Sequence, residues 1–239
     1  MRGIGYHGFR EGNFLSLLHS IDQVVDRHYV WFPGEDKRVL VSNVDKLDLK
    51  RKLFESVRTI VNRLNPEEPW FDKTGNPEMI LTIPMVRELW PSAVFIFAKR
   101  RGIENVISRR TKFPSHPFEY HCANWAKNMA SWRAIREQIP PECFIEVEQR
   151  KMVQRSGDAA RELCAFLGVG DSMLAVAADV METHRPQETT KGSASRTCSL
   201  EASGWTREQI ETFLKNCEAE MRAFGYTLDE QYSSAADVA

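Results

Sequence analysis

The most informative hydrophobic pattern in the chain lies between residues 93 and 110. Residues 93–98 form a short apolar run, rich in aromatic and β-branched side chains, that follows the break signal Trp90–Pro91. Such a run predicts a buried strand rather than a helix. Cations and Gly102 come next, and then apolar residues on one helical face, Ile103, Val106 and Ile107. The predicted strand, basic corner and helix favour a bound anion, because free backbone N–H groups gather at a helix N-terminus.

Apolar residues recur at helical spacing through much of the remaining chain. Helices are expected at 14–25, 45–64, 77–90, 119–138, 156–167 and 171–181, and a last one begins at a capping box formed by Thr206 and Gln209. Strands are expected at 70–75 and 144–148, with a possible one at 38–41. Alternating strands and helices predict an α/β fold with a parallel sheet flanked by helices. We expect one such domain over residues 1–228 and a flexible tail at 229–239.

Composition narrows the class of protein without identifying it. The chain has 239 residues, a net charge of −1 and ordinary globular proportions of 42% hydrophobic and 27% charged residues. A near-neutral chain gives no field that would attract nucleic acid or an anionic membrane, and no apolar run is long enough to span a bilayer. The N-terminus lacks the apolar core of a signal peptide. Five scattered cysteines are typical of reduced thiols, so a cytoplasmic location is expected.

The basic cluster is local in this near-neutral chain. It consists of six cations, Lys99, Arg100, Arg101, Arg109, Arg110 and Lys112. One interpretation is a solvated helix face. The other is a small-anion site, because the cations begin where a predicted buried strand ends, and open α/β sheets place their ligands there. Ser108 lies eight positions after Arg100 and would reach the same corner from the helix.

This spacing resembles the phosphate-binding strand and helix of sulfotransferases that use 3′-phosphoadenosine 5′-phosphosulfate (PAPS). In that family an Arg at the strand end and a Ser eight residues later hold the 3′-phosphate, which implies this role for Arg100 and Ser108. The family's Arg-Asp-Pro corner reads Arg100-Arg101-Gly102 here. The resemblance implies a three-layer domain similar to the P-loop NTPase fold, and PAPS as co-substrate.

Two further elements extend the resemblance to about residues 68–200. Asp72-Lys73-Thr74 is similar to an element of Golgi-type and bacterial sulfotransferases whose Lys contacts the 5′-phosphosulfate, and Lys73 lies 27 residues before Arg100. Gly75 replaces the usual proline. Thr190-Lys191-Gly192 resembles a loop that closes over the adenosine, which implies cofactor binding by Lys191 and Gly192. Residues 147–148 and 160–168 resemble structural markers of the same family.

The N-terminus departs from the family pattern. The family carries a loop of the type Pro-x-Ser-Gly-Thr-Thr between its first strand and first helix, where backbone N–H groups cradle the 5′-phosphosulfate. The glycine-rich residues 3–12 lack this order of residues, and no strand is expected before them. The chain is therefore expected either to be N-terminally truncated or to anchor the donor differently.

The implied chemistry is transfer of a sulfuryl group to a hydroxyl or amine of a small molecule or glycan, with Lys73 neutralising the leaving phosphate. Two residues are candidates for the general base, Glu11 and His121; each also has an ordinary structural interpretation on a helix. The six histidines show no ligand spacing, so no metal is expected. Alternatives are a non-catalytic relative that binds an anionic ligand or partner, and a nucleotide or sugar kinase, although the loop such kinases need is absent.

Overall fold

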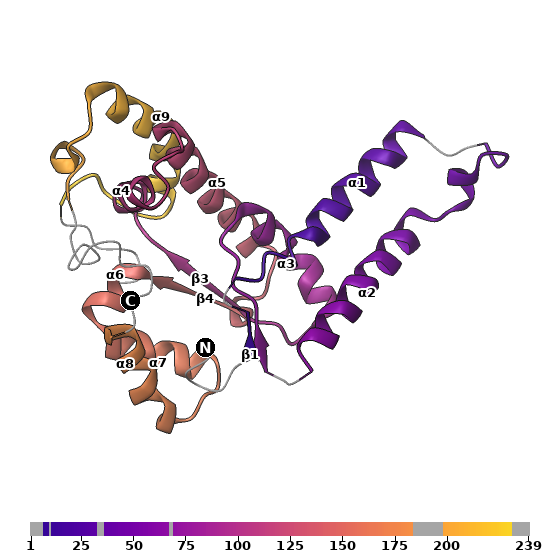
Figure 1. Ribbon diagram of the computed structural model, residues 1–239, viewed down its shortest axis with the longest axis horizontal. Coiled ribbons are helices and arrows are strands. Elements are labelled where there is room, and N and C mark those ends of the chain that lie inside the picture. Colours follow the sequence, from indigo (N-terminus) through magenta and orange to yellow (C-terminus); the bar gives the residue numbers. More distant parts are fainter. Residues whose placement is uncertain (1–6, 10, 33–35, 67–68, 184–197, 231–239) are drawn as a thin grey trace. The chain divides into compact units, whose positions relative to one another are not determined.

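A computed structural model describes residues 7–9, 11–32, 36–66, 69–183 and 198–230 (Figure 1). Contacts divide the chain into two compact units, one of Met1–Ala93 with Ala134–Ile139 and one of Val94–Arg133 with Pro140–Ala239. The predicted loop at 190–192 lies outside the described residues, as does the predicted tail from residue 231 onward.

The first unit contains a two-stranded parallel sheet and helices. Strand β1 (His7–Gly8) pairs with β2 (Trp70–Phe71) in the register His7 to Trp70 and Gly8 to Phe71. The helices are α1 (Leu17–Trp31), α2 (Lys46–Leu64) and α3 (Pro77–Leu89), with a 3₁₀ turn, η2 (Leu40–Asn43). Residues 7–8, within the glycine-rich segment, form a strand that the sequence did not predict, and the possible strand at 38–41 was wrong, because these residues form a turn and the start of η2.

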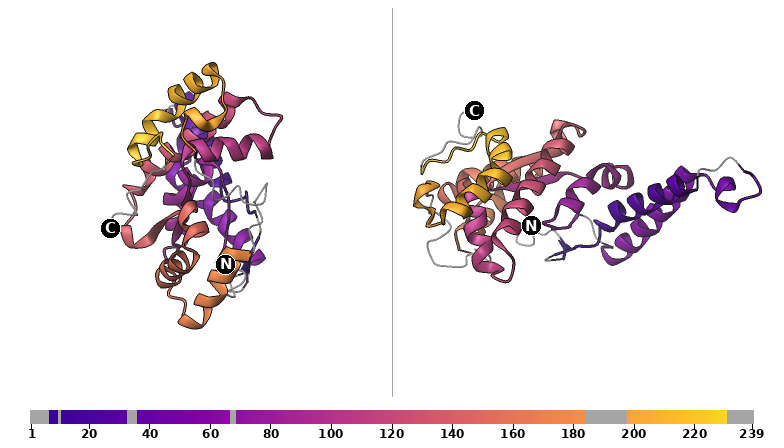
Figure 2. Two further views of the ribbon diagram at one scale, coloured as in Figure 1. Left: turned by 90° about the vertical axis from the view of Figure 1, so that its left-hand side faces the viewer. Right: turned by 90° about the horizontal axis from the view of Figure 1, so that it is seen from above.

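Local signals set the ends of the helices in this unit. The side chain of Asp45 accepts a hydrogen bond from the N–H of Asp48 at 2.7 Å, and Asn76 caps α3 in the same way. Pro77 follows at the first position of α3, where its missing N–H costs nothing. Helices α1 and α2 lie side by side (Figure 2). An ion pair joins them, in which Nζ of Lys50 on α2 lies 2.6 Å from Oδ1 of Asp22 on α1.

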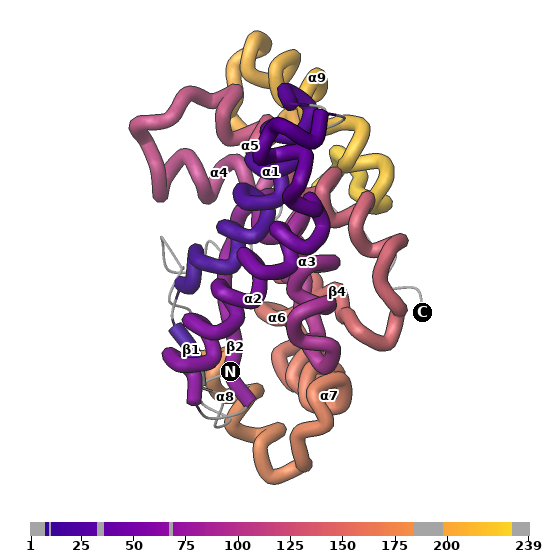
Figure 3. The backbone as a smooth tube through the Cα atoms, turned by 90° about the vertical axis from the view of Figure 1, so that its right-hand side faces the viewer, coloured from indigo at the N-terminus to yellow at the C-terminus, as the bar shows by residue number. Residues whose placement is uncertain are grey.

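The second unit contains the sheet predicted from the central hydrophobic pattern. Strand β3 (Phe95–Lys99) pairs in parallel with β4 (Phe144–Glu148), from Phe95 opposite Phe144 to Lys99 opposite Glu148. The helices are α4 (Gly102–Lys112), α5 (Phe118–Arg136), α6 (Gln149–Gln154), α7 (Ser156–Phe166), α8 (Leu174–Thr183) and α9 (Arg207–Ala223), with 3₁₀ turns η3 (Pro141–Cys143), η4 (Asp171–Met173) and η5 (Glu201–Ser203). Helices α7 and α8 pack together (Figure 3). The sequence did not predict the short helix α6.

Aromatic packing and close helix contact hold this unit together. Trp132 of α5 stacks on Phe97 of β3, with ring centroids 4.6 Å apart. Gly102 begins α4 in close contact with α9, where an added Cβ would lie 3.2 Å from both Phe213 and Met221. The predicted capping box at the start of α9 is confirmed.

The predicted α/β class with parallel strand pairs is confirmed in both units. All five cysteines are free thiols, and three of them are buried. Within the described part of the chain, none of the helices combines the length and apolarity that a membrane crossing requires.

Candidate functional site

Two chain segments leave the sheet of the first unit at the same edge. Because β1 and β2 are parallel, the loop before α1 and residues 72–74 begin side by side. The N–H of Gly12 donates to the carbonyl of Lys73 at 3.1 Å, and the N–H of Asn13 donates to Oγ1 of Thr74 at 2.9 Å. Strand, loop and helix therefore follow one another at the N-terminus, in the arrangement that the sequence alone did not reveal.

The loop contact brings together two of the predicted site residues. Nζ of Lys73 lies 4.0 Å from Oε1 of Glu11, and the two side chains are 53% and 58% exposed. An exposed pair at this distance contributes little to stability, about 0–1 kcal/mol. Both charged groups are therefore accessible to a ligand at the edge of the sheet.

Asp72 is a polar residue of this edge that the sequence did not single out. Its Oδ1 accepts a hydrogen bond from the hydroxyl of Thr74 at 2.7 Å. The carboxylate lies against the Cα of Gly12, where an added Cβ would come within 2.1 Å of Oδ2. Burial raises the pKa of the Asp72 carboxyl, while the Thr74 hydrogen bond opposes the shift. The available signal in the sequence was its position directly before Lys73 at a strand end.

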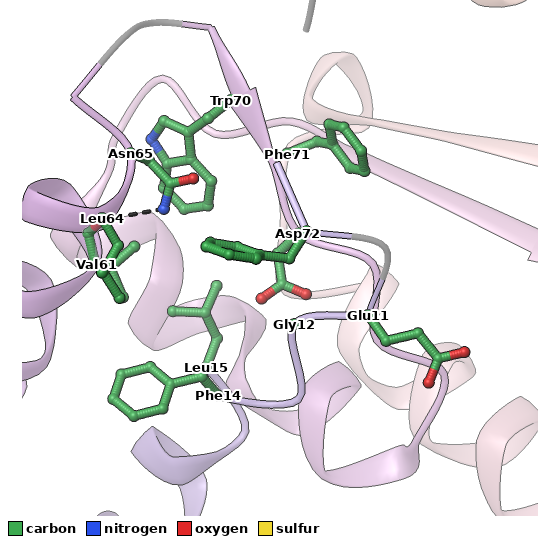
Figure 4. Close-up of a pocket in the computed structure, with 11 residues that line it drawn as sticks. Glu11, Gly12, Phe14, Leu15, Val61, Leu64, Asn65, Trp70, Phe71 and Asp72 are labelled. Atoms are coloured by element: carbon green, nitrogen blue, oxygen red, sulfur yellow. Dashed lines mark hydrogen bonds between the residues drawn. The ribbon is translucent and has the colours of Figure 1, made fainter. Parts of the chain in front are cut away.

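A cavity of about 240 Å³ opens beside Asp72 within the first unit (Figure 4). It is lined by the loop before α1, the end of α2, and β2 with the residue after it. The lining residues are Phe9, Glu11, Gly12, Phe14, Leu15, Val61, Leu64, Asn65, Trp70, Phe71 and Asp72. Apolar and aromatic side chains dominate this lining, and Asp72 and Glu11 are the ionisable groups among its described residues.

The second unit holds Arg100 and Ser108. Arg100 is half-buried directly after β3, and its carbonyl accepts a hydrogen bond from Nε1 of Trp125 at 2.9 Å. Ser108 is half-buried on α4. These positions agree with the predicted arrangement of a strand end followed by a helix.

Arg101 of the basic corner has a structural role. Its side chain is fully buried and paired with the carboxylate of Glu104. It also donates to the carbonyls of Cys198 at 2.7 Å and Thr227 at 3.1 Å, and to that of Asp229. The guanidinium therefore links the start of α4 to the C-terminal segment. Lys99 also forms an ion pair, in which its Nζ lies 2.5 Å from Oε2 of Glu146.

His121, the second predicted base, is fully buried near the start of α5. Burial lowers the pKa of its imidazole, and the nearby charges of Arg109, His116 and Arg110 lower it further; the backbone of Phe113 opposes the shift weakly. A neutral imidazole is therefore favoured, but solvent does not reach it.

The structure thus places the predicted residues in two groups. Lys73 and Glu11 lie in the first unit, and Arg100, Ser108 and His121 lie in the second. Lys191 and Gly192 fall outside the described residues. Among the residues that are described, no group of three His, Cys, Asp or Glu side chains is arranged to hold a metal ion.

A family model described as the sulfotransferase family matches residues 22–172, more than half of the chain. The chain belongs to the sulfotransferase family. The match includes Asp72, Lys73, Arg100, Ser108 and His121, and begins after Glu11.

Comparisons with individual proteins add little detail to this assignment. No curated protein matches the chain. Among solved structures, a sulfotransferase domain from the curacin biosynthetic pathway aligns over 92% of this chain and 75% of its own, with 16% identity and a TM-score of 0.44.

Proposed function

We propose that this sulfotransferase transfers a sulfuryl group from PAPS to a hydroxyl or amine of an acceptor. The observation that carries the proposal is the position of Lys73. It stands at the edge where two parallel strands end, beside the loop that leads into α1. Open α/β sheets bind ligands at this edge, and the family assignment makes the ligand a sulfuryl donor.

The start of α1 complements the charge of Lys73. Helix α1 has no acidic residue in its first turn, so the positive end of its dipole is not offset there. The N–H groups of Leu17 and Leu18 donate to the carbonyls of Phe14 and Leu15, and those of Gly12 and Asn13 donate to residues 73 and 74. The Lys73 ammonium would therefore be the main ligand of the 5′-phosphosulfate, with the helix dipole adding to its field.

The resemblance of residues 99–108 to the family's phosphate site assigns the 3′-phosphate to Arg100 and Ser108, and the adenosine side to Lys191 and Gly192. Arg101 takes no part, because its guanidinium is fully buried and bound to Glu104 and backbone carbonyls.

The reaction requires positioning and charge neutralisation more than covalent catalysis. The acceptor oxygen or nitrogen attacks sulfur in line, and the bond from sulfur to the phosphate oxygen breaks. The electron pair leaves with the phosphate, where Lys73 neutralises the added charge. A base removes the acceptor's proton, a step that contributes about 10²–10⁴-fold.

Calorimetric titration with 3′-phosphoadenosine 5′-phosphate (PAP), the product nucleotide, tests the donor site. Loss of a charge-assisted hydrogen bond costs about 1.5–3 kcal/mol, so Lys73→Ala and Arg100→Ala should each weaken PAP binding about tenfold to a hundredfold. The matched controls are Lys52→Ala and Arg207→Ala, whose side chains are 74% and 94% exposed and pair only along their own helices.

The proposal fails if PAP does not bind, or if the site variants bind it as tightly as the controls do. Binding of PAP without transfer to any acceptor would favour the non-catalytic alternative. Binding of ATP in preference to PAP in the same titration would favour a kinase.

A further inference from the structure

The cavity of the first unit has a buried apolar floor and an exposed apolar rim. Leu15 and Val61 form the floor and are 3% and 6% exposed. Phe9, Phe14 and Leu64 belong to the rim and are 50%, 37% and 56% exposed. A ligand seated here would cover apolar surface that water now contacts, which favours an apolar ligand.

The polar groups among the described lining residues are few, and none of these residues is a Lys, Arg or His. The side-chain nitrogen of Asn65 already donates to the carbonyl of Val61 at 3.0 Å. A sulfated or phosphorylated acceptor would meet the carboxylates of Glu11 and Asp72 among these lining residues, and the Lys73 ammonium beside Glu11 is needed for the donor. A polyhydroxylated sugar would leave most of its hydroxyls without partners.

The two carboxylates of the cavity are placed differently. The side chain of Glu11 extends away from the apolar side chains, whereas the carboxylate of Asp72 lies next to Gly12 and close to Leu15 (Figure 4). Thr74 fixes the Asp72 carboxylate through Oδ1. The carboxylate fills the space that a Cβ at position 12 would take, so glycine at this position lets Asp72 pack against the loop at the edge of the cavity.

We propose that this cavity binds the acceptor, that the acceptor is a small aromatic or apolar alcohol, and that the Asp72 carboxylate takes the proton from its hydroxyl. The proposal rests on the proposed function, because the sulfuryl donor must reach the same edge of the sheet. Lys73 follows Asp72 directly, which places the proposed base and the proposed phosphate ligand on adjacent residues.

The hydroxyl oxygen of the acceptor forms a bond to the sulfur of the phosphosulfate, and its proton passes to Asp72. The bond from sulfur to the bridging phosphate oxygen breaks, and its electron pair leaves with PAP. The protonated Asp72 then returns its proton to solvent, and the products are a sulfate ester and PAP.

The environment of Asp72 agrees with this role. Burial raises the pKa of the carboxyl above its ordinary value, which makes the ionised carboxylate a stronger base than an exposed aspartate. A perturbed carboxyl that lines a cavity next to a cation is a recognised sign of a functional site. The volume of about 240 Å³ lies below the usual range of about 300–1,000 Å³ for drug-sized ligands, so a compact acceptor fits best.

The test uses 2-naphthol as the aromatic probe and N-acetylglucosamine as the sugar probe, with the full chain. Binding of 2-naphthol is followed by saturation-transfer NMR without donor, and transfer is followed with radiolabelled PAPS. Leu64→Trp places a larger side chain on the exposed rim and should weaken 2-naphthol binding at least tenfold while PAP binding is unchanged. Val180→Trp, on the exposed surface of α8 in the other unit, is the matched control.

Asp72→Asn should lower transfer to 2-naphthol by about 10²–10⁴-fold, with binding of 2-naphthol and PAP retained; retained binding also shows that the variant folds. Asp48→Asn, on the surface of α2, is the control and should transfer normally.

The proposal is overturned if Asp72→Asn transfers like the control, or if Glu11→Gln alone abolishes transfer. It is also overturned if Leu64→Trp leaves 2-naphthol binding unchanged, or if N-acetylglucosamine is the better acceptor. Failure of PAP to bind would instead overturn the donor assignment, while 2-naphthol binding would still report on the cavity.

Discussion

Replacing Gly12 with alanine should uncouple the N-terminal loop from the end of β2. An added Cβ at position 12 would lie 2.1 Å from Oδ2, 2.3 Å from Oδ1 and 2.4 Å from Cγ of Asp72. Ordinary van der Waals contact begins at 3.4 Å. The carboxylate or the loop must therefore move by about 1 Å or more to make room, as in other overpacked sites.

Either movement breaks hydrogen bonds. If the carboxylate turns away, it loses the bond from the Thr74 hydroxyl at 2.7 Å. If the loop lifts, the bonds from the N–H groups of Gly12 and Asn13 are lost. A typical hydrogen bond contributes about 0.5–1.5 kcal/mol, and overpacking costs about 1–3 kcal/mol. We expect Gly12→Ala to lower the free energy of unfolding by about 1–3 kcal/mol.

Urea-induced unfolding followed by circular dichroism measures this loss. Gly75→Ala is the matched control, since an added Cβ at Gly75 meets no atom within 4 Å, and its effect should stay within about 0.5 kcal/mol. In an Asp72→Ala background, Gly12→Ala should cost less than about 0.5 kcal/mol, because the obstructing carboxylate is gone. An equal cost of Gly12→Ala in both backgrounds would refute the reasoning.

Three further predictions concern single side chains. Arg101→Ala should lower the free energy of unfolding by about 3–5 kcal/mol, because it leaves the buried Glu104 carboxylate unpaired; thermal unfolding measures this, and a loss below 1 kcal/mol would contradict the structural role. Thr74→Val should cost about 1–3 kcal/mol in urea unfolding, since two hydrogen bonds are lost, whereas Thr74→Ser keeps both. For His121 the lowered pKa means that the unfolded chain binds a proton more readily, so the free energy of unfolding should fall as the pH drops below about 6.5; His121→Leu should flatten this part of the pH profile, and an unchanged profile would count against it.

The sequence predicted best those elements whose ends are fixed by neighbouring residues. Helices α2 and α3 begin where Asp45 and Asn76 stand, since each side chain accepts a hydrogen bond from an N–H three residues later. The last helix begins at Thr206 for the same reason. Strand β3 was recognisable because it begins as a short apolar run after the break at Trp90–Pro91. Strand β4, Phe-Ile-Glu-Val-Glu, carries aromatic and β-branched residues after Pro140–Pro141.

Elements that depend on distant partners were not predictable in this way. Strand β1 has two residues and exists through its pairing with β2, which follows more than 60 residues later. Residues 38–41 were expected as a possible strand, but the chain forms a 3₁₀ turn at 40–43. The side chain of Asn43 instead donates to the carbonyls of Lys37 and Val39, at 2.8 and 2.9 Å, and turns the chain back on itself.

The candidate site illustrates the same limit for charged residues. Arg100 and Arg101 are adjacent and chemically identical, so no local pattern separates a ligand-binding cation from a structural one. The difference arises from carbonyls about 100 residues away, at Cys198 and Thr227, which surround the second guanidinium. In the same way, Asp72 gains its properties from the glycine at position 12, which leaves space for its carboxylate. Residue type thus indicates which chemistry is available, and long-range contacts decide which residue can perform it.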